Sequence, residues 1–583
     1  MASLSRHFTS LKLGVQLSIG KCQRFLTYKN IGAEWPLMYK TVGEVVDEAA
    51  EKYGDKTALI CVDQNKKLSF VEVKQRSENL AAGMLSLGVT PGDRVGLWAP
   101  NSAEWYLASL AMAKAGIISV YLNPAYQADE LKHCMQTVGC KMLLAAESFK
   151  SIKYNEILDA IDPKIAKSEP GRLESSVLPS LKTIVSISDK EYPGMIPLKV
   201  LESKNSGNAR KIVKSVLGMF GPDDASNIQF TSGTTGSPKG AVLTHFNIVN
   251  NSFLVSRRQK LHTKNHIMCF MGPFFHTLGS VVATLSCLHD GMTLVIPAGA
   301  YSATKSAEAI VKEKCTVLLG TPTMYIDIMR VLAEKGLEPQ DAEVAISGGA
   351  FAATSLFRDM LKKLKLKRIS SVYGLTETGP ISFMSKVDDT FEQQVGTVGY
   401  LMDHFEAMVV DENGKRVPWN TPGELWVRGH GVMKGYWNAE EKTKEAITPD
   451  RWFKTGDQFA ISEDGYGRVV GRIKDMIIRG GENIYPADVE EFLSIHPDIV
   501  EVQVIGVPDE RLGEKVCACI RRKVGSNLTE EELKKFCMGK IADFKIPEYV
   551  WFLNTFPRTS SGKVQKYILR NQAMAHFKLR ENK

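Results

Sequence analysis

The sequence predicts an α/β protein: a large N-terminal domain with two parallel αβα-layered subdomains and a small β-barrel, then a small α+β C-terminal domain. Three observations carry this prediction. Strand-like and helix-like segments alternate from Thr41 to about Gln393, short runs separated by turns follow, and a mixed pattern begins near residues 471–475. Such alternation is typical of parallel sheets covered by helices on both faces. A chain of 583 residues is long enough for about two to four structural units.

Residues 1–33 form a basic, acid-free start. They contain Arg6, Lys12, Lys21, Arg24 and Lys29, and Glu34 is the first acid. Removing these five from the 73 basic residues leaves 68 against 65 acidic ones, so the net charge of +8 becomes +3. A Ser-containing, acid-poor amphipathic start is typical of a mitochondrial transit peptide, which would direct the chain to the matrix. A disordered tail is the alternative.

The first alternating stretch runs from Thr41 to about residue 212. Ser69 and Glu72 form a capping box for a helix that extends to about Ser86, and Asn101 with Glu104 predicts the start of another. Residues 203–212 are mostly polar and predict a surface linker. The remaining expectations are strands at 57–62, 94–98, 117–122 and 141–145 and a helix at 129–137.

A hydroxyl-rich and glycine-rich loop then lies between two short apolar runs. It consists of Thr231, Ser232, Gly233, Thr234, Thr235, Gly236, Ser237, Pro238, Lys239 and Gly240. Glycines let backbone N–H groups approach a ligand, hydroxyls donate to phosphate oxygens, and Lys239 adds a positive charge. The order Lys239–Gly240 is not that of a P-loop, which has Gly-Lys before Ser or Thr. The composition favours a polyphosphate grip over a merely flexible turn.

Further βα units follow this loop. Thr244 is expected to cap a helix to Arg257, residues 271–279 break the regular pattern, and strands are expected at 293–296, 317–319, 344–347 and 369–373. Two polar segments, 347–350 and 373–377, follow the last two of these strands. Because ligands bind beyond the carboxyl ends of strands in open α/β sheets, both segments and the loop can face one crevice.

From about Gln393 the chain changes to short runs and turns that predict the β-barrel, and we place a domain boundary at 471–475. The C-terminal part is expected to contain helices at 488–494 and 530–538, strands at 502–507, 516–522 and 549–553, an exposed loop at 557–563 and a terminal helix. The resulting domains are 1–33, 41–470 and 475–583.

Composition excludes several classes of protein. No window of about 18 apolar residues lacks a charge, which excludes a transmembrane segment. The ten cysteines include no Cys-x-x-Cys pair, which argues against a disulfide framework or a zinc site. Because most of the basic bias lies in residues 1–33, a nucleic-acid partner is not expected. The sequence does not indicate an oligomeric state.

Five motifs together resemble the AMP-forming acyl-CoA synthetases, the superfamily shared with adenylation domains and firefly-type luciferases. They are residues 231–240, Tyr373–Thr378, Thr455–Asp457, Gly471–Arg472 and Pro557–Lys563, in the order and spacing of the family. The resemblance implies two half-reactions. A carboxylic acid and ATP give acyl-AMP and pyrophosphate, and coenzyme A then takes the acyl group as AMP leaves. The nearest likeness within the family implies a medium-chain fatty acid.

The resemblance also implies roles for individual residues. Thr376 would contact phosphate, Glu377 would bind Mg²⁺, Asp457 would hold the ribose hydroxyls and Arg472 ribose or phosphate. Ser347–Ala350, including Gly349 and Ala350, would flank adenine together with Tyr373 and Gly374. Taken from the residues alone, Thr376–Glu377 could instead be a helix cap, Asp457 a plain turn residue, and Arg472 a surface ion-pair partner.

Four further assignments rest on the same resemblance. Lys563 would be the adenylation lysine, although a lysine in such a loop is usually just solvated. The hinge for a swing of the C-terminal domain would be Lys474 or the adjacent Asp475. Gly480, Gly481 and Glu482 would line the coenzyme A channel. His276 would stand on the acyl-pocket wall and gate the carboxylate, or else be an ordinary core histidine.

Three other functions remain open at this point. A luciferase-like oxidoreductase and an enzyme that loads a separate carrier protein would share every motif, because both make an acyl adenylate. A non-enzymatic nucleotide-binding protein would be expected to carry a broken motif, and the sequence contains none.

Overall fold

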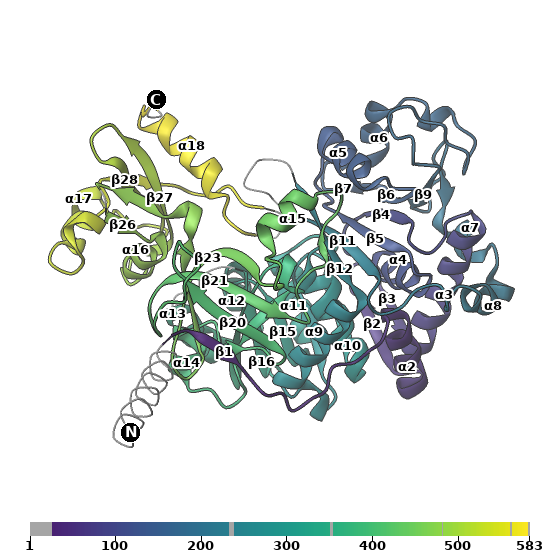
Figure 1. The fold of residues 1–583 in the computed structure, drawn as a ribbon, viewed down its shortest axis with the longest axis horizontal. Helices are drawn as coiled ribbons and strands as arrows, with labels where there is room; N and C mark the ends of the chain where they lie inside the picture. Colours follow the sequence, from purple (N-terminus) through teal and green to yellow (C-terminus); the bar gives the residue numbers. More distant parts are fainter. Residues whose placement is uncertain (1–25, 232–237, 350–353, 481, 560–561, 581–583) are drawn as a thin grey trace, which may run out of the picture.

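The structure is a computed structural model that describes residues 26–231, 238–349, 354–480, 482–559 and 562–580. Several expectations fall outside these residues: most of the predicted transit peptide, the centre of the 231–240 loop (Ser232–Ser237), Ala350 and Gly481. Figure 1 shows a large body with a smaller C-terminal unit beside it, drawn in yellow and green.

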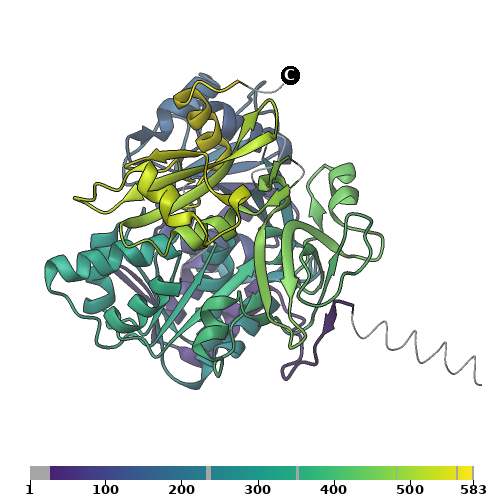
Figure 2. The same cartoon turned by 90° about the vertical axis from the view of Figure 1, so that its left-hand side faces the viewer.

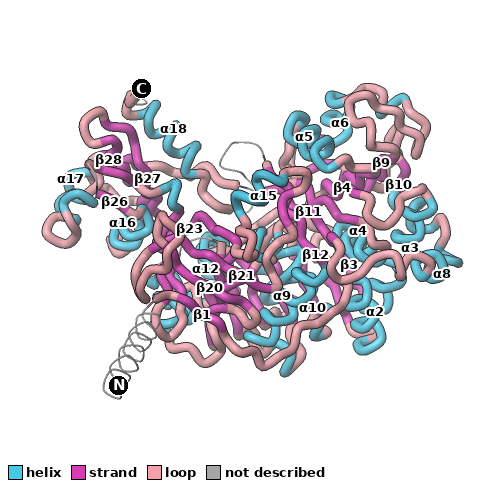
Figure 3. Tube along the Cα trace, in the orientation of Figure 1, coloured by secondary structure: helices cyan, strands magenta, loops and turns pink. Residues whose placement is uncertain are grey.

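An eight-stranded sheet forms the first half of the large body (Figures 1 and 3). Strands β9, β6, β4, β5 and β11 are parallel, and β12 runs antiparallel beside β11. The order across the sheet is β10 (Ile196–Pro197), β9 (Thr183–Ile187), β6 (Met142–Ala146), β4 (Arg94–Trp98), β5 (Ile118–Leu122), β11 (Ala225–Thr231), β12 (Lys239–Thr244) and β22 (Gly435–Tyr436).

A nine-stranded sheet forms the second half. Its centre, from β2 to β17, is parallel, and both of its edges are antiparallel. The order is β19 (Tyr400–Leu401), β18 (Ile381–Met384), β17 (Arg368–Gly374), β16 (Val344–Gly348), β15 (Val317–Gly320), β13 (Ile267–Phe270), β14 (Thr293–Ile296), β2 (Thr57–Cys61) and β3 (Lys66–Ser69).

Helices cover both sheets, as the alternating pattern predicts. One apolar core joins residues of both sheets with α2 (Val42–Tyr53), α3 (Phe70–Ser86), α4 (Ala103–Lys114), α9 (His245–Arg258) and α10 (Thr284–Asp290). The outer faces pack against α5 (Ala128–Val138), α6 (Tyr154–Ile161), α11 (Ala303–Lys312), α12 (Pro322–Lys335) and α13 (Thr354–Lys363). Among the described residues, no helix is both long enough and apolar enough to cross a membrane.

The predicted β-barrel is wrong in one respect, because the sheet is not closed. Five antiparallel strands lie in the order β1 (Tyr28–Asn30), β20 (Phe405–Val410), β21 (Gly423–Gly429), β23 (Phe453–Ile461) and β24 (Gly467–Arg472). The first and last strands of this order do not pair with each other, so the sheet stays open. Period-two alternation in β20 and β21 fits an open sheet with one buried face as well as a barrel.

The C-terminal unit has its own sheet and two apolar cores of its own (Figure 2). The sheet order is β26 (Glu482–Ile484), β25 (Ile477–Arg479), β28 (Gly513–Arg522) and β27 (Ile499–Asp509), with β29 (Tyr549–Phe552) beside β28. Its helices are α16 (Pro486–Leu493), α17 (Glu530–Cys537) and α18 (Lys566–His576). A single 3₁₀ turn, η6 (Ile473–Asp475), joins β24 to β25.

Local capping predictions are mostly confirmed. Ser69 and Thr244 cap α3 and α9. The prediction for α4 is wrong by one residue, because Ser102 rather than Asn101 accepts from the N–H of Trp105. The predicted linker at 203–212 is instead partly helical, with α8 (Ala209–Lys214) packing a buried alanine and valine against the body.

Candidate active site

Two polar segments leave the same edge of the nine-stranded sheet. Strands β16 and β17 are parallel neighbours with Gly348 opposite Val372, so their carboxyl ends lie side by side. Gly349 follows β16 directly, and η5 (Thr376–Thr378) begins just after β17 ends at Gly374. The expected juxtaposition of these two loops beyond the strand ends is therefore present.

The hydroxyl-rich loop connects the two expected strands, β11 and β12, and the structure shows that they pair as a hairpin. Thr231 pairs with Lys239, and Phe230 pairs with Gly240, at its base. The Lys239 ammonium lies over the Tyr436 ring, 5.2 Å from the ring centroid. Gly240 packs closely on β11, since a Cβ there would lie 2.8 Å from Ile228 Cγ2. These contacts fix the position of Lys239 at one end of the loop.

Glu377 joins the loop base to the strand-end crevice. Its Oε1 accepts hydrogen bonds from Tyr436 Oη at 3.0 Å and from Thr231 Oγ1 at 3.3 Å. Burial and the adjacent Glu377 carboxylate raise the pKa of Tyr436, so this phenol remains a hydrogen-bond donor. Thr376 precedes Glu377 in the same 3₁₀ turn. The Glu377 carboxylate is thus grouped with the Thr231 and Tyr436 hydroxyls at the base of the hydroxyl-rich loop.

Asp457 on β23 contacts Tyr373 at the end of β17. It is 3% exposed, accepts from Tyr373 Oη at 2.6 Å, and has Arg472 Nε 2.6 Å from its Oδ1. Burial raises the pKa of Asp457, and the Arg472 cation and the Tyr373 hydrogen bond oppose that rise. Tyr373 belongs to the nine-stranded sheet and Asp457 to the five-stranded sheet, so this hydrogen bond holds the two sheets together at the crevice.

Lys563 comes from the C-terminal unit and enters the same crevice. A Cβ placed on Gly349 would lie 3.5 Å from Lys563 Cε, so the lysine passes over the loop that follows β16. The Lys563 side chain still contacts solvent. Its pKa is lowered by the desolvation of its ammonium among these residues and by the Arg472 cation. The Asp457 and Glu377 carboxylates oppose this shift. The structure thereby brings together residues that lie more than 180 positions apart in the sequence.

His276 lies at the entry to a π-helical segment, η4 (Leu278–Ala283). Its ring is 5.0 Å from that of Phe275, and its carbonyl accepts from the N–H of Ser280. Burial lowers the pKa of His276 to about 4, and Lys563 contributes to the shift. The imidazole is therefore neutral at pH 7 and belongs to the crevice that contains Lys563.

Comparison with known families decides the class of this site. The family model described as AMP-binding enzyme matches residues 46–437, and the model described as AMP-binding enzyme C-terminal domain matches residues 488–563. The first match alone covers more than half of the chain. The chain belongs to the AMP-binding enzyme family.

Relatives of this AMP-binding enzyme cover nearly its whole length. It is 44% identical over 548 residues to the mitochondrial medium-chain acyl-CoA ligase ACSF2 of Rattus norvegicus, covering 93% of this chain and 89% of the relative. It is 36% identical over 544 residues to the putative acyl-CoA synthetase YngI of Bacillus subtilis, covering 93% and 99%. The crystal structure of ATP-bound MatB from Rhodopseudomonas palustris has a TM-score of 0.76 at 28% identity, covering 93% and 100%.

The glycines of this AMP-binding enzyme serve its backbone in different ways. Gly349 has φ +85°, a conformation that side chains rarely adopt. A Cβ on Gly374 would lie 1.8 Å from the carbonyl oxygen of Pro380, so this glycine is needed for packing against the chain that follows it. The expectation that Gly374 flanks adenine stays a prediction.

The predicted hinge and coenzyme A residues lie apart from this crevice. Lys474 and Asp475 form the 3₁₀ turn between β24 and β25. Gly480 has φ +60° and donates its N–H to Leu512 O at 2.7 Å, and Glu482 pairs with Arg479 across a hairpin. The described residues of this hairpin bond to Leu512, Glu514, Phe544 and Glu548, all within the C-terminal unit. In this arrangement Lys563 faces the crevice, and the hairpin does not.

Tyr436 and Arg558 are site residues that sequence reasoning missed. Tyr436 is brought to Glu377 because β22 pairs with β12, a contact between segments about 200 residues apart. No local motif marks it. Arg558 stands inside the Pro557–Lys563 motif and could have been found there, since an arginine five residues before the lysine has the reach to contact the loop.

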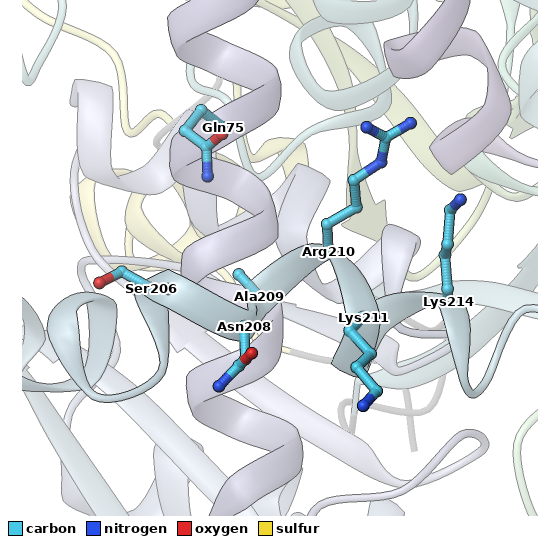
Figure 4. A pocket seen from close by; sticks show the side chains of 8 residues that line it. Gln75, Ser206, Asn208, Ala209, Arg210, Lys211 and Lys214 are labelled. Carbon is cyan, nitrogen blue, oxygen red and sulfur yellow. The ribbon is translucent and has the colours of Figure 1, made fainter.

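A separate basic hollow lies far from these residues in the sequence. It has a volume of about 570 Å³. Gln75 of α3 and residues of the 206–214 segment, including Arg210, Lys211 and Lys214, line it (Figure 4). In Figure 4, Arg210 and Lys214 extend to one side of the segment and Lys211 to the other. None of the predicted site residues lines it.

Proposed function

We propose that this AMP-binding enzyme is an ATP-dependent acyl-CoA ligase whose substrate is a medium-chain fatty acid. The observation that carries the proposal is the convergence of Lys563, Asp457–Arg472 and Glu377 on one crevice. Lys563 and Arg472 bring the positive charge that two anionic reactants require, and the two carboxylates can hold hydroxyl donors or a metal ion. The chain-length assignment is supported by the 44% identity to a relative named as a medium-chain acyl-CoA ligase.

The chemistry proceeds in two steps. In the first, a carboxylate oxygen of the acid bonds to the α-phosphorus of ATP, and the bond to the bridging oxygen breaks to release pyrophosphate. In the second, the coenzyme A thiolate bonds to the acyl carbon, and the acyl–phosphate C–O bond breaks to release AMP. The fatty acid supplies the first nucleophile, so the protein needs no nucleophilic side chain. Its task is to hold two anions together and neutralise developing charge.

Individual side chains suit these tasks. Asp457 Oδ1 contacts Arg472 and Oδ2 accepts from Tyr373. Because each carboxylate oxygen can accept a second hydrogen bond, Asp457 can also accept from two ribose hydroxyls. Lys563 would bridge the carboxylate and the α-phosphate. The hydroxyl-rich loop, with Lys239 at its end, would hold the β- and γ-phosphates and release them as pyrophosphate. The neutral His276 would line the acyl entry without adding charge.

The donor atoms around Glu377 fit a magnesium–nucleotide complex. Mg²⁺ prefers hard oxygen ligands and keeps several waters, so one or two protein oxygens and the phosphates suffice. Glu377 would hold the ion with Thr231 and Thr376 near it, and no cluster of three or more His, Cys, Asp or Glu side chains occurs among the described residues. When bound, the ion would neutralise phosphate charge.

We further propose that the enzyme acts in the mitochondrial matrix, with Lys474 or Asp475 as the hinge and Gly480–Glu482 as part of the coenzyme A channel. The mitochondrial assignment is supported by relatives named as mitochondrial and by the basic, acid-free start of the chain. The domain boundary at 471–475 coincides with the single turn η6 that joins the two sheets.

A substrate panel tests this function. The protein is incubated with ATP, Mg²⁺ and coenzyme A, the acid is varied from acetate through octanoate to palmitate and benzoate, and AMP release is measured. We expect coenzyme A-dependent AMP release that is greatest with octanoate and is lost without Mg²⁺. A maximum with acetate, palmitate or benzoate contradicts the chain length, and no coenzyme A-dependent AMP with any acid contradicts the ligase assignment.

A further inference from the structure

The loop that presents Lys563 is held by a single arginine with three different kinds of partner. Arg558 Nη1 donates to the carbonyl oxygen of Gly562 at 2.7 Å, inside the loop itself. Its Nη2 forms an ion pair with Glu501 on β27 of the C-terminal sheet. Its Nη1 also lies 3.4 Å from Thr323 Oγ1 in the first turn of α12, which belongs to the large body. One guanidinium thus connects loop, sheet and body.

The described residues of the loop also bond to one another. Thr559 N–H donates to Lys563 O at 2.8 Å, Lys563 N–H donates to Thr559 Oγ1 at 3.1 Å, and Gln565 N–H donates to Pro557 O at 2.9 Å. These bonds define the shape of the loop but not its direction relative to the crevice. Direction requires contacts to something outside the loop, and Arg558 supplies such contacts to both Glu501 and Thr323.

Arginine is suited to this position because its planar fork can serve several acceptors at fixed angles. The Arg558 and Glu501 side chains are 24% and 14% exposed, so the ion pair is partly shielded from water. Gly562 immediately precedes Lys563 and has φ +85°, so movement of its carbonyl redirects the next side chain. Fixing the Gly562 carbonyl therefore fixes the start of Lys563.

We propose that Arg558 is a positioning residue that aims Lys563 at the crevice for the first half-reaction. The inference rests on the proposed function, because it assigns Lys563 to acyl-AMP formation. Arg558 contacts neither the Asp457–Arg472 pair nor Glu377, so its effect on the reacting groups passes through the loop.

Glu501 provides a matched control. It also pairs with Arg521, its direct cross-strand partner on β28, whose Nη2 lies 3.2 Å from Glu501 Oε2. Arg521 and Arg558 therefore share one carboxylate, but only Arg558 contacts Gly562 and Thr323. Removing Arg521 takes away a similar ion pair and leaves the loop contacts in place.

The test compares the two half-reactions in Arg558→Ala, Arg558→Lys and Arg521→Ala. Acyl-AMP formation is followed by fatty-acid-dependent pyrophosphate release, and thioester formation is followed from supplied acyl-AMP and coenzyme A. Since misplacing a reacting group by about 1 Å can cost roughly 10²-fold, we expect Arg558→Ala to slow the first half-reaction by about 10- to 100-fold. The second half-reaction and both half-reactions of Arg521→Ala should stay near wild type.

Arg558→Lys keeps a positive charge for Glu501 but loses the planar guanidinium, so it should recover only part of the rate of the first half-reaction. It also takes the place of Arg558→Ala if that variant does not fold. Equal slowing of both half-reactions, or no slowing, in Arg558→Ala overturns the inference. Loss of the first half-reaction in Arg521→Ala as well assigns the effect to the Glu501 ion pairs and also overturns it. A wild-type protein that forms no acyl-AMP from any acid contradicts the proposed function instead.

Discussion

Asp457 and Arg472 are direct cross-strand partners on β23 and β24, and their side chains form an ion pair at 2.6 Å. The pair is asymmetric, because the Asp457 side chain is 5% exposed and the Arg472 side chain 42% exposed. Burial raises the pKa of Asp457 above its ordinary value of 3.8 despite the adjacent cation. Burial thus opposes the charged form of Asp457, and groups with perturbed pKa values of this kind cluster at ligand-binding sites.

Asp457→Asn is predicted to weaken nucleotide binding without destabilising the fold. Hydrogen bonds to a charged group contribute roughly 1.5–3 kcal/mol, so the KM for ATP should rise by about 10- to 100-fold. A carboxyl whose pKa is raised by folding stabilises the protein most below pH 3.8, and this contribution is lost as pH rises through the folded-state pKa. The Asn variant should therefore match or exceed the wild-type Tm at pH 7, as measured by thermal unfolding. A clearly lower Tm would show that the ion pair is net stabilising.

Lys563→Ala is predicted to abolish acyl-AMP formation and to spare thioester formation from supplied acyl-AMP. Removing one group that stabilises developing charge typically costs roughly 10²–10³-fold, and only the first half-reaction should show this loss. Lys523→Ala, an exposed lysine of the same C-terminal unit, is the control and should leave both half-reactions unchanged. Equal loss of both half-reactions in Lys563→Ala would contradict the assignment.

Much of this site could be predicted because its parts are local motifs. Short sequence signatures, set by backbone conformation or by charge, mark three of these parts. They are the strands around the 231–240 loop, the polar ends of β16 and β17, and the Lys563 loop. The convergence of these motifs follows from parallel strand ends meeting at one edge of a sheet. Family resemblance supplied the roles, which the residues alone left open.

The rest could not be predicted because it depends on long-range pairing. Nothing near Tyr436 in sequence indicates Glu377 as its partner, since the contact exists only through the β12–β22 pairing. The open five-stranded sheet was predicted as a barrel because alternation within a strand does not say whether the first and last strands meet. The packing of Gly374 against Pro380 O is likewise not visible in sequence.

The pH dependence of acyl-AMP formation should be governed by Lys563 on its alkaline side. Burial and Arg472 lower the pKa of Lys563 below the ordinary 10.5, so kcat/KM, which reports the free enzyme, should fall below that pH as the lysine loses its proton. Arg472→Gln removes a neighbouring positive charge and should move this fall to higher pH, whatever it does to the absolute rate. If the alkaline decrease in kcat/KM occurs at the same pH in Arg472→Gln, the decrease does not report the titration of Lys563.

His276 should contribute no inflection between pH 5 and 8. Its pKa is lowered to about 4, chiefly by burial, so the ring is already neutral throughout this range. The pH profile of kcat/KM for His276→Asn should therefore run parallel to that of the wild type, even if the amide changes the rate by altering the acyl entry. A wild-type inflection near pH 6.5 that disappears in His276→Asn would mean that the histidine titrates during the reaction.

The contacts of residues 27–30 bear on where the predicted transit peptide would end. Thr27 is fully buried, its Oγ1 donates to Val417 O at 2.7 Å and Pro418 O at 3.0 Å, and Tyr28–Asn30 form strand β1 against β20. A leader of 33 residues would remove this strand, whereas cleavage before Leu26 would keep it. At about 1 kcal/mol net per hydrogen bond, a chain starting at Glu34 should be about 2–4 kcal/mol less stable in urea unfolding than one starting at Leu26. Equal stability of the two chains would mean that β1 is dispensable and that residues 1–33 can be removed as a unit.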